Sequence, residues 1–321
     1  PPGGSLDVEL TLDVREGQTS DVTIVENYPA GWTVSNLSAS TGNAQDDGSG
    51  AITWTTSGAS GVATLSYTLN VPADASGTAS ISGTYDDGAG FAGDTGSADL
   101  LVMEFPPSDL SPFDGHMDIG SIVAAGSVGR AGNDWVVIGG GADIWGTADA
   151  FHYLYKRVQG DFKMSIENAS IVPIGENPTS NDWAKMGIMA RQSLEPGSAY
   201  AFAMLRMSDQ AFMLQYREVD GGSAAPGFTA DSAVYLEDVG AGAFPHHGSI
   251  ALERRGDDFV IFYDDDTGTE VEWDAWTVVM EDPIYVGIAV TSHQTGATGA
   301  GLFSDVQFTG TAVPVERWML H

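Results

Sequence analysis

The chain has 321 residues, of which 44 are Asp or Glu and 12 are Lys or Arg, so its formal net charge at pH 7 is -32. A surface this negative repels the phosphate backbone of nucleic acids and anionic lipid headgroups, which argues against nucleic acid and membrane as partners. The absence of cysteine excludes disulfide bonds, thiolate-ligated metal sites and a thiol nucleophile. Because 42% of the residues are hydrophobic, the charge indicates a folded acidic protein.

The acidic residues are spread over the whole chain. Residues 1–110 carry 15 acids and one base, and residues 111–321 carry the other 29 acids and 11 bases, which gives net charges of -14 and -18. A uniformly negative surface suits a salty or extracellular medium, where screening weakens self-repulsion. With no run of 18 apolar residues, we expect no membrane insertion and an extracellular or cell-surface location. The two ends favour a processed piece of a longer secreted polypeptide.

Short strands are predicted throughout the first hundred residues. In residues 6–14, apolar side chains alternate with polar ones, the period-two pattern of a strand with one wet face. Similar runs, separated by turn sequences such as Asp46-Asp47-Gly48, lie at 21–25, 33–37, 52–55, 63–69 and 78–85. Strands spaced this regularly predict an all-β fold, with an immunoglobulin-like β-sandwich over residues 1–103.

Residues 104–117 are predicted to be a linker, because Pro106, Pro107 and Pro112 favour extended backbone. The following region contains longer strand-like runs at 135–138, 151–158, 162–166, 184–191, 200–205, 211–218, 249–254, 259–263, 284–292 and 301–309. About ten strands of this kind fit a two-sheet jelly roll over residues 118–310. Residues 311–321 are a C-terminal tail or the start of a next segment.

Four stretches of this second region carry a family resemblance. In order, they are Gly-Ala-Asp-Ile-Trp-Gly-Thr-Ala-Asp-Ala-Phe-His-Tyr at 141–153, Trp-Ala-Lys-Met-Gly-Ile-Met-Ala-Arg at 183–191 with Ser-Leu-Glu-Pro-Gly-Ser at 193–198, Leu-Glu-Arg at 252–254 with Gly256 and Phe259, and Asp-Pro-Ile-Tyr-Val-Gly-Ile-Ala-Val-Thr-Ser-His at 282–293. Together they resemble bacterial secreted proteins with a concanavalin A-like, DUF1349-related module. The first domain more weakly resembles the repeats that accompany such modules. The resemblance implies a laminin G-like or lectin-like sandwich that binds glycans or mediates attachment.

Two loop tryptophans are the candidate sugar-binding residues. Trp145 follows three consecutive glycines, where backbone can approach a ligand closely, and Trp183 ends a loop containing Pro and Gly. Aromatic faces stack on pyranose C–H groups, and Asp149 and Arg191 are the candidates for hydrogen bonds to sugar hydroxyls. The alternative is that each tryptophan belongs to the core of the sandwich.

Calcium is the candidate ion. Asp264, Asp265 and Asp266 lie in one acidic turn before Gly268, and carboxylate oxygens are the ligands that Ca²⁺ prefers. The alternative is a hairpin turn whose Asp and Gly residues serve the backbone only.

Two further functions are alternatives to a non-enzymatic binding module. Glu270, Glu272 and Asp274 alternate along a predicted strand, which would place three carboxylates on one face, as in sandwich-fold glycoside hydrolases. A solvated strand face is the simpler interpretation. The other alternative is a structural subunit of a filament or surface array, assembled through free sheet edges or through the apolar tail at 311–321.

Overall fold

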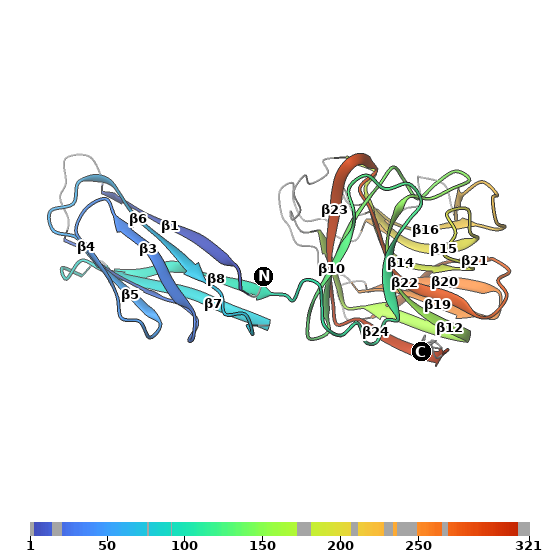
Figure 1. Cartoon of the computed structure of the whole chain (residues 1–321), viewed down its shortest axis with the longest axis horizontal. Helices are drawn as coiled ribbons and strands as arrows, with labels where there is room; N and C mark the ends of the chain where they lie inside the picture. The colour runs from blue at the N-terminus through green and yellow to red at the C-terminus, as the bar shows by residue number, and fades with distance from the viewer. Residues whose placement is uncertain are drawn as a thin grey trace, which may run out of the picture. The chain divides into compact units, whose positions relative to one another are not determined.

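The computed structural model describes residues 3–14, 21–75, 77–90, 92–171, 181–206, 211–227, 234–235, 249–264 and 269–313. The chain divides into two compact units, Pro1–Phe105 and Pro106–His321, each built from β-strands (Figure 1). The predicted all-β class is confirmed. Over the described residues, no helix has the length and apolar character needed to cross a membrane.

The first unit is a sandwich of two antiparallel sheets. Its strands are β1 (Ser5–Val14), β2 (Thr23–Asn27), β3 (Thr33–Ala39), β4 (Asn43–Asp46), β5 (Ala51–Thr55), β6 (Gly61–Asn70), β7 (Gly77–Asp86) and β8 (Ala92–Val102). One sheet has the order β1-β6-β3 and the other the order β4-β5-β2-β7-β8.

The core of this sandwich follows directly from the period-two pattern. Along β6, Leu65, Tyr67 and Leu69 are buried while the residues between them are partly exposed. Ile52 and Trp54 of β5 complete the core from the opposite sheet, and both are fully buried. Alternate side chains of a strand point to opposite faces, so each sheet presents one apolar face to the other.

The second unit has sixteen strands among its described residues. They are β9 (Gly115–Ile119), β10 (Ser127–Ala131), β11 (Asp134–Gly141), β12 (Phe151–Ile166), β13 (Asn168–Ile171), β14 (Lys185–Arg191), β15 (Tyr200–Arg206), β16 (Ala211–Arg217), β17 (Ala225–Pro226), β18 (Val234–Tyr235), β19 (Ile250–Arg255), β20 (Asp258–Asp264), β21 (Glu270–Thr277), β22 (Ile284–Thr291), β23 (Gln294–Ser304) and β24 (Gln307–Ala312).

Two sheets enclose the larger core of this unit. The smaller sheet has the order β10-β11-β23-β13. The larger has the order β17-β16-β15-β14-β22-β12-β19-β20-β21, with β18 beside β16 and with β9 and β24 beside β12. Ile188, Ile288 and Leu154, on three neighbouring strands of the larger sheet, are fully buried in the core between the sheets.

The opposite face of the larger sheet is covered as well. Tyr153, Met189 and Phe202 alternate with the residues of the main core and form a second buried cluster with Ile144, which precedes Trp145. The central strands are therefore buried on both faces, and the loop that carries Trp145 packs on the outer one.

Several strand boundaries differ from the sequence prediction. The predicted strands at 151–158 and 162–166 form one strand, β12, and the residues between them are accommodated by a register shift between Gln159 and Phe162 in its pairing with β24. The predicted strand at 301–309 divides into β23 and β24 at Asp305, whose φ is 46°. The start of β9 lies within the segment 104–117 that we expected to be a linker.

Candidate functional site

Trp145 and Trp183 are both exposed on the second unit. Their exposed fractions are 41% and 50%, so neither lies in the core. A cation lies over each ring, with Lys185 Nζ 5.5 Å from the Trp145 centroid and Arg206 Cζ 4.6 Å from the Trp183 centroid. Cation–π contacts of this kind restrain the orientation of a ring.

The two cations place both tryptophans near the same ends of two neighbouring strands, the start of β14 and the end of β15. Lys185 begins β14 and Arg206 ends β15, and the two residues are directly opposite each other in the antiparallel pair. Opposed residues have Cα atoms about 5 Å apart and side chains on the same face. Each tryptophan therefore contacts one member of a single cross-strand pair.

Asp143 pairs with the cation that lies over Trp145 and with a histidine. Lys185 Nζ donates to its Oδ1 at 2.6 Å, and Nε2 of His293 lies 3.1 Å from its Oδ2. Lys185 is almost fully buried, and this burial lowers its pKa while Asp143 opposes the shift. Asp143 and His293 keep 25% and 30% of their side chains exposed. We call Asp143, Trp145, Trp183, Lys185, Arg206 and His293 the tryptophan rim.

The expectation that Asp149 and Arg191 contact a ligand is corrected by their burial. Asp149 is 2% exposed and Arg191 is fully buried, so neither side chain reaches the surface. Arg217, also fully buried, donates to both Asp149 carboxylate oxygens, at 2.8 and 2.6 Å. Arg191 lies 3.6 Å from the same carboxylate and donates to the carbonyls of Ser193 and Glu195. A carboxylate between two guanidinium groups is neutralised inside the protein.

These buried groups instead position the loop of Trp145. Arg217 donates to the Gly146 carbonyl at 3.1 Å, and the Ala224 amide donates to that carbonyl at 2.7 Å. Gln215 and Lys185 both donate to the Ile144 carbonyl, at 2.7 and 3.0 Å. Residues on both sides of Trp145 are thus fixed to β14 and β16, and the indole is presented on rigid backbone.

The predicted calcium turn lies largely outside the described residues. Asp264 ends β20, and its amide donates to the Ser249 carbonyl, whereas Asp265 and Asp266 are not described. Across the described ranges, no three His, Asp or Glu side chains are grouped so that they could hold a metal ion. In a similar turn, Asp47 Oδ1 accepts three backbone N–H bonds, which lower its pKa.

The three carboxylates of β21 do not share a face. A register shift in the pairing of β20 with β21 makes Trp273 an extra residue, so Glu272 is opposite Phe262 and Asp274 is opposite Ile261. Ile261 belongs to the main core, which places Asp274 on the face opposite Glu272. On the exposed face, Glu270 pairs with Lys163 and Glu272 pairs with Arg255. The carboxylate row expected from the spacing is therefore broken by the bulge.

Two histidines form a separate polar chain between β9 and β12. His152 is 2% exposed, with Nδ1 2.7 Å from Asp118 Oδ1 and Nε2 3.0 Å from His116 Nδ1. If the carboxylate fixes the proton on His152 Nδ1, His152 Nε2 accepts from His116. This arrangement joins the first strand of the second unit to its longest one.

The sequence prediction did not include five residues that build the tryptophan rim or support it, namely Asp143, Lys185, Arg206, His293 and Arg217. One local signal was present, because Lys185 is a charged residue inside the apolar run 184–190. Such a residue must be paired when the strand is buried. Arg217 lies 68 positions from Asp149, and no local pattern connects them.

Comparisons with known proteins find distant similarity to solved structures. No family model matches the chain, and no curated protein matches it. A solved structure of a functionally unknown protein from Saccharomyces cerevisiae is 15% identical with a TM-score of 0.42, covering 63% of this chain and 98% of that chain. A cycloalternan-degrading enzyme from Trueperella pyogenes, solved with a covalent intermediate, is 10% identical with a TM-score of 0.25. The match covers 94% of this chain and 33% of the enzyme.

Proposed function

We propose that the chain is a non-enzymatic extracellular module that binds carbohydrate at the tryptophan rim and thereby attaches to a cell surface or matrix. In this proposal residues 118–310 are a concanavalin A-like jelly roll of the DUF1349-related kind, and residues 1–103 are an immunoglobulin-like sandwich. The observation that carries the proposal is the exposure of Trp145 and Trp183 beside one cross-strand pair of cations.

The chemistry of the tryptophan rim suits a sugar. A cation over one face of an indole leaves the other face for the C–H groups of a pyranose, and aromatic rings bring large contact area at low entropic cost. Asp143, whose side chain keeps 25% of its surface exposed beside Lys185 and His293, supplies carboxylate oxygens that can accept hydrogen bonds from sugar hydroxyls. The anchored loop of Trp145 reduces the ordering cost of binding.

A glycan array tests the proposal. The intact chain is expected to bind at least one class of glycan, and the double variant Trp145→Ala/Trp183→Ala is expected to lose that signal. Trp273→Ala is the matched control, because Trp273 is 37% exposed on β21 and lies outside the tryptophan rim. Binding that survives the double variant would place the site elsewhere.

A second assay addresses catalysis. The intact chain is incubated with the polysaccharide that the array identifies, and released reducing ends are measured. We expect no turnover, because Glu270 and Glu272 are held in ion pairs with Lys163 and Arg255 on an exposed face. Turnover that disappears in Glu272→Gln would instead identify a glycoside hydrolase.

A further inference from the structure

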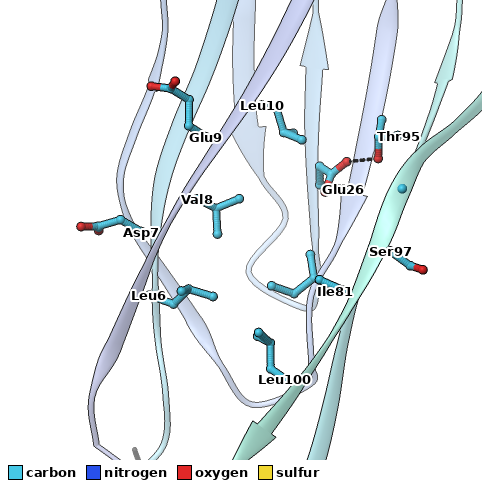
Figure 2. A pocket seen from close by; sticks show the side chains of 12 residues that line it. Leu6, Asp7, Val8, Glu9, Leu10, Glu26, Ile81, Thr95, Ser97 and Leu100 are labelled. Atoms are coloured by element: carbon cyan, nitrogen blue, oxygen red, sulfur yellow. Dashed lines mark hydrogen bonds between the residues drawn. The ribbon is translucent and has the colours of Figure 1, made fainter. Parts of the chain in front are cut away.

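A groove with a volume of about 390 Å³ opens along the first unit, between β1 and β8 (Figure 2). Leu6, Val8 and Leu10 of β1 point into it from one side, and Leu100 of β8 lines the other. Glu26 of β2 and Ile81 of β7 lie between these walls. The groove lies wholly within the first unit and is independent of the tryptophan rim.

Both walls of this groove are edge strands. Among the described strands, β1 is the end of the three-stranded sheet and β8 is the end of the five-stranded sheet, so each pairs on one side only. The outer side of such a strand offers a row of backbone N–H and C=O groups to any extended segment that approaches. An added strand in this position would extend a sheet and close the gap between the two sheets.

The apolar core is incompletely covered at the same place. Ala98 is directly opposite Ile81, and cross-strand partners share a face, so Ala98 faces the interior. Ile81 is buried, yet Ala98 is exposed. Leu6, Val8 and Leu10 are only half-buried, although they alternate as core residues should. The sandwich is therefore open along one side, and further apolar side chains would complete its core.

A buried carboxyl lies in the middle of this apolar groove. Glu26 is 3% exposed, and Thr95 Oγ1 donates to its Oε1 at 2.5 Å. A Cβ on Gly83 would lie 1.8 Å from that oxygen, so the glycine leaves room for the carboxyl. Burial raises the pKa of Glu26. The hydroxyl of Tyr67, near this carboxyl, is buried without a hydrogen-bond partner in the part of the chain described. The buried Glu26 carboxyl would be stabilised by a cationic partner.

We propose that the groove accepts residues 315–320 of a second copy of this chain as an added β-strand, with Arg317 meeting Glu26, so that copies join into a linear assembly. The segment reads Val-Glu-Arg-Trp-Met-Leu and lies outside the described residues. In an extended strand, Val315, Arg317 and Met319 share one face, which places a cation between two apolar side chains. The sequence apolar–cation–apolar on this face matches the groove, where the Glu26 carboxyl lies between apolar residues of β1 and β8.

Two further features of the sequence favour this occupant. Pro314 directly precedes the segment, and proline is tolerated at the first residue of a strand. The chain has 12 basic residues against 44 acidic ones, so a base within an apolar run is uncommon, and Arg317 complements the carboxyl of Glu26 inside the apolar groove. A contact between two different surfaces of identical copies propagates as a filament unless it closes into a ring.

Sedimentation velocity of the full chain tests the assembly. At about 1 M NaCl, which screens the general repulsion, the sedimentation coefficient is expected to rise with protein concentration. Arg317→Gln on the strand and Ala98→Trp in the groove are each expected to raise the dissociation constant at least tenfold. The matched controls Arg255→Gln and Ala92→Trp alter exposed residues outside the groove and are expected to change it less than twofold.

A double-mutant cycle tests the specific pair. If Arg317 meets Glu26, adding Arg317→Gln to Glu26→Gln changes the dissociation constant less than twofold. A tenfold effect in that background would overturn the pairing. The proposal is overturned if the chain stays monomeric, or if neither Arg317→Gln nor Ala98→Trp changes the dissociation constant.

Hydrogen exchange distinguishes a groove filled by the tail of a second copy from a groove filled by the chain's own tail. Amides of β1 and β8 are expected to gain protection as concentration rises and to lose it when residues 314–321 are removed. Protection that depends on the tail but not on concentration means that the chain's own tail fills the groove, which contradicts assembly. The outcome is independent of glycan binding, because the groove and the tryptophan rim have no residue in common.

Discussion

At Trp145, exposure and rigidity come from different parts of the chain. The indole is exposed, but the carbonyls of Ile144 and Gly146 on either side accept hydrogen bonds from buried side chains of β14 and β16. Arg217 supplies one of these bonds while both its terminal nitrogens are held by Asp149. The buried pair of Arg217 and Asp149 therefore helps to position the exposed indole of Trp145, because Arg217 also holds the backbone at Gly146.

Asp149 is expected to matter for stability and only indirectly for binding. Asp149→Asn leaves the Arg217 guanidinium buried without its carboxylate, which should cost about 3–5 kcal/mol of unfolding free energy. Asp109→Asn is the control, because Asp109 is 70% exposed in its pair with Arg130 and should cost under about 1 kcal/mol. Urea denaturation measures both, and equal losses for the two variants would contradict this role.

The His116–His152 contact predicts sensitivity to acid. Burial and the His152 imidazole lower the pKa of His116 below its ordinary value of 6.5. The unfolded chain therefore binds more protons in this range, and the stabilisation present above pH 6.5 is lost as pH falls through the folded-state pKa. We expect the unfolding free energy to fall more between about pH 7.5 and about pH 5.5 in the intact chain than in His116→Asn.

Comparison with the variant is essential for this measurement. Acidification also reduces the net charge of -32 and so relieves self-repulsion in both proteins, and the difference between them cancels that contribution. A His116→Asn variant that loses as much stability as the intact chain would show that the histidine contact does not titrate as described.

At the scale of the element, β14 is the strand that most constrains the rim. It pairs with β15 and β22, it begins at Lys185, and its third residue is Gly187. Gly187 has a φ of 146°, and a Cβ there would lie 2.1 Å from the carbonyl oxygen of Ala203 on β15. Only glycine allows the two strands to approach this closely, and the opposition of Lys185 and Arg206 depends on that approach.

Gly187→Ala is accordingly expected to be severely destabilising. The clash is with backbone, which cannot rotate away, so we expect a loss of about 3 kcal/mol or more in unfolding free energy. Gly256→Ala is the control, because Gly256 also has a positive φ of 66° but nothing lies within 4 Å of its added Cβ, and strain alone costs about 1–2 kcal/mol. Thermal unfolding of both variants checks the difference, and equal losses would mean that the Ala203 contact relaxes.

The elements most accessible to sequence reasoning are those with one wet face. The alternation at 6–14 predicts β1, and its observed bounds are Ser5–Val14. By contrast, β8 was not predicted, because its run of Gly, Asp, Ser and Ala lacks apolar alternation. That strand is defined by pairing with β7, a tertiary interaction that no local pattern shows.

The candidate site was predictable in part for a similar reason. Glycines and prolines near Trp145 and Trp183 indicated loops, and both rings are exposed. The same loop sequence contains Asp149, which is buried because Arg217, far along the chain, neutralises it. The Trp273 bulge likewise depends on the register between β20 and β21, and a strict two-residue period cannot foresee it.

At the scale of the whole molecule, the dominant physical property is negative charge. The net charge is -14 over residues 1–110 and -18 over residues 111–321, so carboxylates repel one another within each part of the chain. Local ion pairs, such as Arg254 with Asp282 and Lys185 with Asp143, offset part of this repulsion. Stability of the whole chain should therefore depend on ionic strength.

We expect the unfolding temperature to rise with NaCl. Between about 0.1 M and about 1 M, the Debye length falls from about 10 Å to about 3 Å, which removes most repulsion between exposed carboxylates. Scanning calorimetry of the intact chain measures the effect. An unfolding temperature at 1 M that is equal to or below the value at 0.1 M would contradict the view that surface charge limits stability.

We propose that Trp145 and Trp183 form one carbohydrate-binding surface, and calorimetric titration with the glycan that the array identifies measures the contribution of each ring. Loss of a stacked ring costs about 1.4 kcal/mol or more, so Trp145→Ala and Trp183→Ala should each weaken binding at least about tenfold, while Trp273→Ala leaves it unchanged. Equal affinity in the intact chain and in both variants would show that the two tryptophans do not form the binding surface.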